Sequence, residues 1–182
     1  MDKSQVTLLA LFDASSAFDM VDPEILHRRL EISFGLCGPP LDWFRSYLSD
    51  RSQMIILGDS RTCWIPLKFG VPQGSVLGPL LYIMFTADIP LLFSKHSASG
   101  HLYADDTQAF VHGSPAQQFA LCQSIERLSQ DLDRWMSSNR LSLNASKMQL
   151  IWLGTRQQLL KLDYVAIAER FPSLTFLTRV RN

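Results

Sequence analysis

Two adjacent acidic residues, Asp105 and Asp106, lie between two short apolar runs of the chain. At close range each carboxylate favours protonation of the other, and a bound divalent cation removes that electrostatic cost. A third carboxylate, Asp13, follows the apolar run of residues 6–12. Converging carboxylates make an oxygen-lined site suited to Mg²⁺. Two such ions would activate a 3′-hydroxyl and stabilise a leaving pyrophosphate.

Each acidic residue also has a simpler interpretation as part of the local structure. Asp13 would serve equally well as a helix cap or as a solvated turn residue. The Asp pair suits a turn, because Asp side chains bond their own backbone. The three carboxylates meet only if the first strand and the hairpin of residues 100–112 are neighbours in one sheet. This adjacency is a prediction that the tertiary structure must test.

Three further features are candidates for ligand binding, and each also has a plain structural role. The loop of residues 70–75 (GVPQGS) is either a turn that opens a helix or a surface where Gly74 admits a flat ligand and Gln73 bonds it. Phe18 fits either core packing or a ring beneath a sugar that excludes a 2′-hydroxyl. Lys147 is either a solvated lysine or a cation beside a leaving phosphate.

The order of predicted elements indicates an α+β fold in which helices back an antiparallel sheet. Residues 6–12 form a continuous apolar run, which predicts a strand buried on both faces. Residues 76–93 are apolar nearly all round and predict one central buried helix, whereas residues 115–139 have the spacing of an amphipathic helix. The other predicted elements are helices at 23–34 and 42–48 and strands at 54–57, 63–67, 100–103, 107–112, 148–153 and 174–177.

Composition and charge set broad limits on the protein. The chain has 182 residues, of which 47% are hydrophobic, and this suits one domain or a large piece of one. A formal net charge of zero argues mildly against a nucleic-acid partner, because such proteins usually carry a basic excess. Cys37, Cys63 and Cys122 are odd in number and widely spaced, so we expect buried free thiols in a reducing, intracellular compartment, either nuclear or cytoplasmic. No apolar run is long enough to cross a membrane.

Four blocks, in series, carry a family resemblance. Residues 9–22 (LALFDASSAFDMVD) look like polymerase motif A, residues 70–81 (GVPQGSVLGPLL) like motif B, and residues 103–106 (YADD) like motif C. Residues at the positions of motif D follow in the same order: Trp135, Asn139, Leu141, Leu143, Asn144 and Lys147. With these blocks, the chain resembles the reverse transcriptases of LINE-type (non-LTR) retrotransposons over nearly its full length.

The resemblance implies a catalytic set of residues and a metal cofactor. Asp13 and Asp105 would be the main metal ligands, with Asp106 as the third carboxylate. The backbone carbonyl of Ala14 would join the metal shell, and Lys147 would lie near the departing phosphates. The implied cofactor is a pair of Mg²⁺ ions, for which Mn²⁺ can substitute.

The resemblance also implies contacts with substrates. Phe18 would be the sugar gate, while Gln73 and Gly74 would contact the incoming nucleotide and the template. Tyr103 and Ala104 would lie near the primer end. The implied partners are an RNA template, a DNA primer and dNTPs, with no membrane; the oligomeric state stays open.

The fold that the resemblance implies is the palm of a right-hand polymerase, with fingers and thumb largely missing. Residues 1–182 would then be a partial reverse transcriptase domain with little or no activity alone. The alternatives are a degenerate retrotransposon relic or a palm-like module that only binds RNA, and another metal-dependent nucleotidyl enzyme such as a cyclase. Within the same class, a reverse transcriptase like those of group II intron maturases is the nearest alternative.

Overall fold

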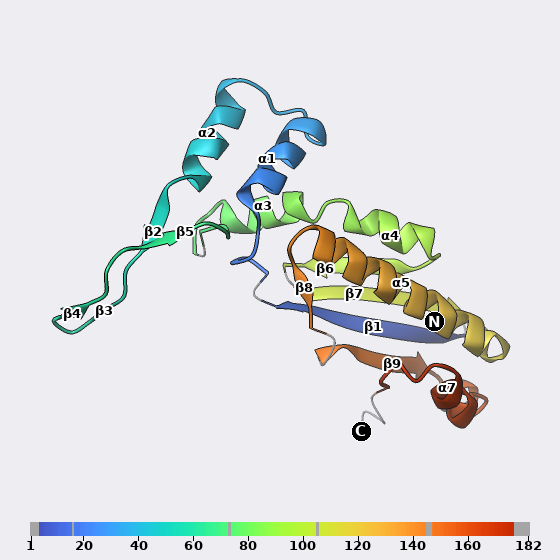
Figure 1. Ribbon diagram of the computed structural model, residues 1–182. Helices are drawn as coiled ribbons and strands as arrows, with labels where there is room; N and C mark the ends of the chain where they lie inside the picture. Colours follow the sequence, from blue (N-terminus) through green and yellow to red (C-terminus); the bar gives the residue numbers. More distant parts are fainter. Residues whose placement is uncertain (1–3, 16, 73, 105, 145–146, 177–182) are drawn as a thin grey trace. The chain divides into compact units, whose positions relative to one another are not determined.

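The computed structural model describes residues 4–15, 17–72, 74–104, 106–144 and 147–176 (Figure 1). The chain divides into two compact units, which are described separately. The first unit comprises residues 1–15, 88–138 and 142–182, and the second comprises residues 16–87 and 139–141. The first carries a mixed arrangement of helices and an antiparallel sheet, and the second is mainly helical with two short hairpin ladders.

The sheet of the first unit is antiparallel throughout its named strands. Its central strand, β1 (Val6–Ser15), pairs on one side with β7 (Asp106–Gly113), which in turn pairs with β6 (Ser99–Tyr103). The other edge of β1 pairs with β8 (Ser142–Leu143) and β9 (Gln149–Gly154). The predicted adjacency of the first strand and the 100–112 hairpin is therefore confirmed.

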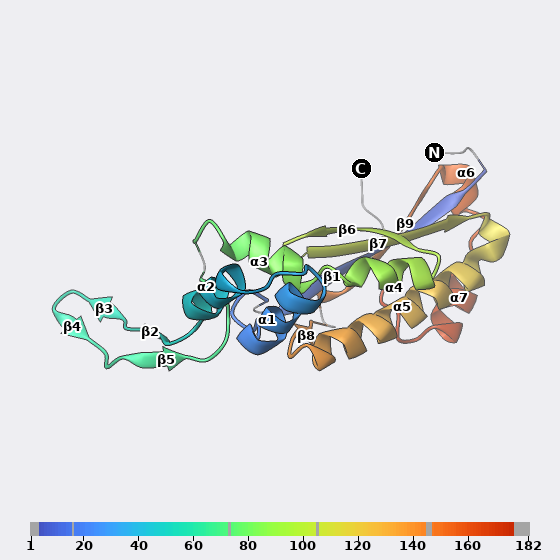
Figure 2. The same cartoon turned by 90° about the horizontal axis from the view of Figure 1, so that it is seen from above.

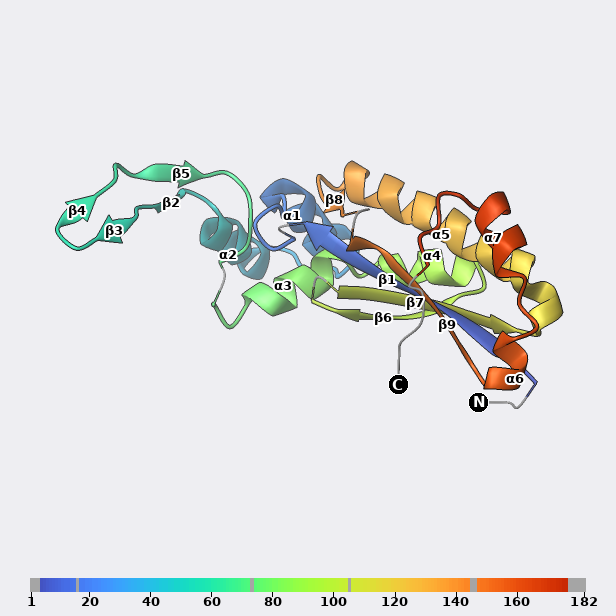
Figure 3. The same ribbon diagram turned by 90° about the horizontal axis from the view of Figure 1, so that it is seen from below.

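Helices cover one face of this sheet. They are α4 (Ile89–Lys95) and α5 (Gln118–Ser138), with α7 (Tyr164–Arg170) packed on α5 (Figures 2 and 3). A 3₁₀ turn (Pro115–Gln117) leads into α5, and the short α6 (Arg156–Leu159) follows β9. The amphipathic spacing predicted for residues 115–139 is confirmed, because the buried residues of α5 include Cys122, Ile125, Leu128 and Leu132.

The prediction that the first strand is buried on both faces is wrong. Burial alternates along β1: Val6, Leu8 and Ala10 are fully buried, whereas the residues between them are half-buried. Alternation is the pattern of an antiparallel sheet with helices on one face only. Leu9 and Leu11 make the run continuously apolar, but they do not lie on the helix-covered face. A continuous apolar run therefore did not require burial on both faces.

The second unit packs three helices together. Helix α1 (Pro23–Ile32) contacts α2 (Pro39–Leu48) and α3 (Gly78–Phe85). Asp22 caps α1: its Oδ1 accepts hydrogen bonds from the backbone N–H groups of Glu24 and Ile25 at 2.8 and 3.2 Å, as its place just before Pro23 and Glu24 suggests. Between α2 and α3 lie two short ladders, β2 (Arg51–Gln53) with β5 (Ile65–Leu67) and β3 (Ile56–Leu57) with β4 (Ser60–Arg61).

The prediction of one buried helix over residues 76–93 is also wrong. This segment forms α3 and α4, and residues 86–88 between them lie outside both helices. Pro90 lies in the first turn of α4, where its missing N–H costs nothing. Several apolar side chains of the segment are exposed, such as Val76, Ile83 and Leu91, which are 94%, 59% and 70% exposed. The apolar run of residues 76–93 therefore corresponds to two helices that are each only partly buried.

The thiols differ in their surroundings, and this corrects the expectation that all three are buried. Cys122 is buried in α5, and burial raises the pKa of its thiol to about 12. Cys37 and Cys63 are exposed, and all three thiols are free. Within the described residues no helix is both long enough and apolar enough to cross a membrane.

A charged cluster ties α4 to α5 and makes a prediction about acid stability. Lys95 Nζ lies 2.6 Å and His96 Nε2 2.9 Å from Asp131 Oδ2, and Arg134 Nη1 lies 2.8 Å from Asp131 Oδ1. The hydrogen bonds from Lys95 and His96 lower the pKa of Asp131 from 3.8 to about 2. A carboxyl group whose folded pKa is lowered stabilises the fold above its ordinary pKa and loses that effect as the pH falls.

We therefore expect Asp131→Asn to lower the melting temperature at neutral pH. The difference from the unmodified protein should shrink as the pH falls from 3.8 through about 2, the pH at which half of the native carboxylates are protonated. Melting curves followed by circular dichroism measure both effects. Asp133→Asn, an exposed position on the same helix, should leave the melting temperature nearly unchanged. A deficit that persists at full size at the acid end would contradict the ionic explanation.

Candidate active site

Asp13 and Asp106 lie directly opposite each other on the neighbouring strands β1 and β7. Cross-strand partners project on the same face of a sheet, with Cβ atoms roughly 4.5–5.5 Å apart, and like charges in this position destabilise the pair. Asp13 has a side chain 29% exposed, and Asp106 is exposed. Asp105, the third predicted carboxylate, lies outside the described residues. The structure thus brings together two of the three acidic residues that the sequence singled out.

The turn beside Asp106 contains a strained backbone. Tyr103, the last residue of β6, pairs with Asp106, the first residue of β7, and Ala104 directly follows Tyr103. Ala104 has a φ of 52°, in the left-handed region. A non-glycine residue there costs about 1–2 kcal/mol. The strain lies next to the carboxylates, which is where backbone strain tends to be tolerated.

Ala104→Val is expected to destabilise the first unit by about 1–2 kcal/mol, because a β-branched side chain at positive φ adds a clash to the existing strain. Urea denaturation of the chain measures the change in the free energy of unfolding. Ala104→Gly is the matched variant, since glycine adopts this conformation without strain. Its free energy of unfolding should equal or exceed that of the unmodified protein. Equal stabilities for the Val and Gly variants would contradict the assigned backbone conformation.

The edge of β1 that carries Asp13 is paired by two separate strands. β8 pairs with Ala14 and Ser15, and β9 pairs with Leu11 and the residues before it. Phe12 and Asp13 are therefore the residues of β1 that neither strand pairs on this edge.

Backbone hydrogen bonds bring a lysine to the first carboxylate. The backbone N–H of Asn144 donates to the carbonyl of Asp13 at 2.9 Å, and the N–H of Lys147 donates to the carbonyl of Asn144 at 3.0 Å. Lys147 Nζ lies 3.2 Å from Asp13 Oδ2. An ammonium group beside two facing carboxylates offsets their mutual repulsion. The lysine that the sequence predicted near the chemistry is therefore beside Asp13.

The described donors fit a hard divalent cation. Asp13 and Asp106 supply carboxylate oxygens on one face, and oxygen ligands are those that Mg²⁺ prefers. The ammonium of Lys147 already lies 3.2 Å from one of these oxygens, Asp13 Oδ2. In the described part of the chain, no cluster of three or more His, Cys, Asp or Glu side chains is suited to a metal. The predicted third ligand, Asp105, is not among those residues.

The second unit joins the end of motif A to the start of motif B. The N–H of Val71 donates to the carbonyl of Phe18 at 2.9 Å, and the N–H of Gly70 donates to the carbonyl of Val21 at 2.7 Å. Gly70 has a φ of +88°, and a Cβ there would lie 2.9 Å from the Asp19 carbonyl oxygen. This close approach requires glycine. The backbone that carries Phe18 is therefore positioned by the predicted binding loop.

The ring of Phe18 has a partner that sequence reasoning missed. It stacks on Tyr82 of α3, with ring centroids 4.7 Å apart and an interplanar angle of 22°. Tyr82 is buried, and Phe18 is half-buried. Sequence reasoning assigned Tyr82 only to an apolar core run, and no periodic signal separates a stacking partner from a core residue. Phe18 thus combines the packing role with a partly accessible ring.

The loop that follows Gly70 is held at the start of α3. Ser75 Oγ donates to the carbonyl of Pro72 at 2.6 Å and accepts from the N–H of Gly78 at 3.0 Å. Gly74 has a φ of 76°, and no atom would lie within 4 Å of a Cβ there. Gln73 lies outside the described residues. The open space at Gly74 is compatible with the predicted approach of a ligand, and a bound ligand would test it.

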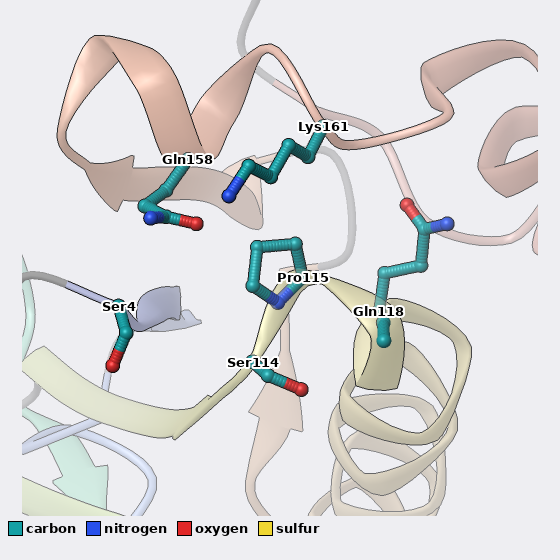
Figure 4. A pocket seen from close by; sticks show the side chains of 7 residues that line it. Ser4, Ser114, Pro115, Gln118, Gln158 and Lys161 are labelled. Atoms are coloured by element: carbon teal, nitrogen blue, oxygen red, sulfur yellow. The ribbon is translucent and has the colours of Figure 1, made fainter.

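A separate cavity lies far from the carboxylates. It measures about 450 Å³ and is lined by Ser4, Ser114, Pro115, Ala116, Gln118, Gln158 and Lys161 (Figure 4). Ser4 precedes the start of β1 and Asp13 lies near its end, so the two are about 30 Å apart at 3.3 Å per strand residue. The cavity is therefore not part of the carboxylate site.

Comparison with known proteins identifies the family of the chain. Residues 1–167 match the family model described as reverse transcriptase (RNA-dependent DNA polymerase). A probable RNA-directed DNA polymerase from transposon BS of Drosophila melanogaster is 30% identical over 151 residues, which cover 80% of this chain and 16% of that protein. The RNA-directed DNA polymerase from mobile element jockey of the same species is 25% identical, covering 86% of this chain and 17% of that protein.

A third relative extends the same pattern. The probable RNA-directed DNA polymerase from transposon X-element of Drosophila melanogaster is 29% identical over 139 residues. The chain spans about one sixth of the length of the first two relatives. With a family match that covers most of its residues, the chain belongs to the reverse transcriptase family, and the predicted kinship with LINE-type (non-LTR) elements is confirmed.

Proposed function

We propose that this chain forms the palm of an RNA-directed DNA polymerase that adds dNTPs to a DNA primer on an RNA template. The observation that carries the proposal is the pair Asp13 and Asp106, opposite each other across two strands with Lys147 Nζ 3.2 Å from Asp13 Oδ2. The antiparallel sheet with helices on one face is the architecture expected of such a palm. The family match supports the same chemistry.

The acidic residues would hold the metal cofactor. Asp13 and Asp106 would provide carboxylate oxygens, Asp105 a third carboxylate, and Ala14 a backbone carbonyl. Two bound Mg²⁺ ions, or Mn²⁺ in their place, would activate the primer 3′-hydroxyl and neutralise charge on the departing pyrophosphate. The contribution of the chain is to fix the two facing carboxylates on rigid strands, because ligands on strands are held more precisely than ligands on loops.

Other residues would position the substrates, and these roles rest on the family resemblance. Phe18 would lie beneath the sugar of the incoming nucleotide and exclude a 2′-hydroxyl by its bulk. Gln73 and Gly74 would contact the nucleotide and template, with Tyr103 and Ala104 near the primer end. Tyr103 is 81% exposed and thus available for such a contact.

The activity would belong to a longer protein. The relatives are about six times longer than the stretch that this chain matches. Positioning of substrates supplies much of the catalysis of a two-substrate reaction. We therefore propose that these 182 residues alone extend primers little or not at all. The names of the relatives, which refer to transposons and mobile elements, favour a LINE-type enzyme over a maturase-like one.

Metal binding by the chain itself tests the proposal. Titration with Mn²⁺, followed by electron paramagnetic resonance of the free ion, should show binding that Asp13→Asn and Asp106→Asn each weaken at least about tenfold. Substitution of a residue that only supports a metal ligand lowers the metal affinity about 10–100-fold. Substitution of a ligand itself should therefore lower the affinity by at least roughly this amount. Asp59→Asn, at an exposed turn, is the control. Unchanged affinity in both carboxylate variants would favour the alternative of a non-catalytic RNA-binding module.

A further inference from the structure

We infer that Lys147 is an exchangeable internal counter-ion: it holds Asp13 in the metal-free protein, and a divalent cation must displace its ammonium group to bind. The inference rests on the proposed metal site and adds a competing cation supplied by the chain. Its basis is the contact between Lys147 Nζ and Asp13 Oδ2 at 3.2 Å. That oxygen belongs to a carboxylate expected to ligate the metal.

The backbone places Lys147 at this position independently of the ion pair. On this edge of β1, β8 and β9 leave Phe12 and Asp13 unpaired. The N–H of Asn144 donates to the Asp13 carbonyl, and the N–H of Lys147 donates to the Asn144 carbonyl. Two residues after Lys147, Gln149 of β9 pairs with Leu11 of β1. The chain is thus fixed to β1 on both sides of Lys147, and this places the lysine beside Asp13.

The two partners differ in how easily they can move. The Asp13 side chain is 29% exposed on a paired strand, whereas the Lys147 side chain is 64% exposed at the end of a flexible four-carbon stem. Exposed ion pairs stabilise proteins by only about 0–1 kcal/mol, so breaking this one costs little. A divalent ion that contacts Asp13 and Asp106 together gains more than a single ammonium that contacts one of them. A divalent ion should therefore replace the ammonium of Lys147 at Asp13.

The exchange links two events at the site. Without metal, the ammonium offsets the repulsion between Asp13 and Asp106, which face each other in register. With metal, that compensation comes from the ion, and the ammonium is released beside the site. Lys147 then becomes available to an anionic group of the substrate only after the metal has bound. The chain thereby orders the two steps.

The first test is the metal affinity of lysine variants, measured by Mn²⁺ titration of the chain. Lys147→Gln removes the competing ammonium group. This variant should bind Mn²⁺ about two- to fivefold more tightly, a gain that corresponds to the free energy of one exposed ion pair. Lys147→Arg keeps the charge and should match the unmodified protein. Lys161→Gln, an exposed lysine of the same unit lining the separate cavity, should change nothing. Unchanged or weaker binding by Lys147→Gln would overturn the inference.

The second test separates displacement from a general effect of charge. Lysine side-chain NMR of the chain should show the Lys147 Nζ signal move towards that of a solvated lysine as Mg²⁺ is added. The same shift should be present without metal in Asp13→Asn. A Lys147 signal that Mg²⁺ leaves unmoved, in a protein that binds Mg²⁺, overturns the exchange.

The outcomes distinguish this inference from the proposed function. If Asp13→Asn loses Mn²⁺ while Lys147→Gln binds as the unmodified protein does, the metal site stands and the exchange is wrong. If the unmodified chain and every variant fail to bind Mn²⁺, both proposals are wrong.

Discussion

Asp13→Asn is expected to lower RNA-templated primer extension at least about a hundredfold, since a catalytic metal ion contributes several kcal/mol of charge stabilisation in the transition state. Asparagine has nearly the same shape as aspartate but lacks the negative charge, so the loss reports on the carboxylate. Asp13 is the acidic residue with the most structural support here, because it faces Asp106 and contacts Lys147. Asp106→Asn is expected to act in the same direction.

Steady-state incorporation of dNTPs on an RNA template, with a longer protein that contains these residues, measures this effect. The loss should appear mainly in kcat, because the metal stabilises charge that develops in the transition state. Asp59→Asn is the matched control at an exposed turn. Circular dichroism should confirm that Asp13→Asn is folded, and removal of a like charge opposite Asp106 favours that result. Full activity in Asp13→Asn would exclude this residue as a metal ligand.

Gly100→Ala is expected to destabilise the first unit by about 1–3 kcal/mol, the usual cost of forcing extra volume into a packed region. A Cβ at Gly100 would lie 2.4 Å from Phe93 Cε2 of α4 and 2.6 Å from the carbonyl oxygen of Gln108 on β7. The carbonyl belongs to the strand ladder and cannot move without loss of pairing between β6 and β7. The hairpin that presents Asp106 would therefore shift.

Urea denaturation of the 182-residue chain measures this loss. Gly154→Ala is the control. The nearest atom to a Cβ at Gly154 would be Val6 Cγ1, a side-chain atom 3.2 Å away, and the next would lie 3.5 Å away. Phe93→Ala combined with Gly100→Ala removes the ring contact and leaves the carbonyl contact. The two changes should therefore be non-additive, with part of the Gly100→Ala loss recovered. Additive losses would mean that α4 does not pack on Gly100.

The elements that could be predicted from the sequence are those with a local cause. The amphipathic spacing of α5, the Asp22 cap of α1 and the strands around the Asp pair all follow from short-range patterns. The expectations that proved wrong concern burial. Leu9, Ile83 and Leu91 are apolar but incompletely buried, since hydrophobicity says which residues can be buried and not which face another element covers.

The family of the chain was determined by the sequence alone, because residue types and the order of the four blocks can be read without any knowledge of packing. The tertiary structure decided which of these residues meet. The register of β1 against β7 puts Asp13 opposite Asp106, and a one-residue slip would move one of them to the other face. The contact of Lys147 with Asp13 depends on the gap in pairing that β8 and β9 leave along β1 at Phe12 and Asp13. Such pairings join residues more than ninety positions apart, and local periodicity carries no record of them.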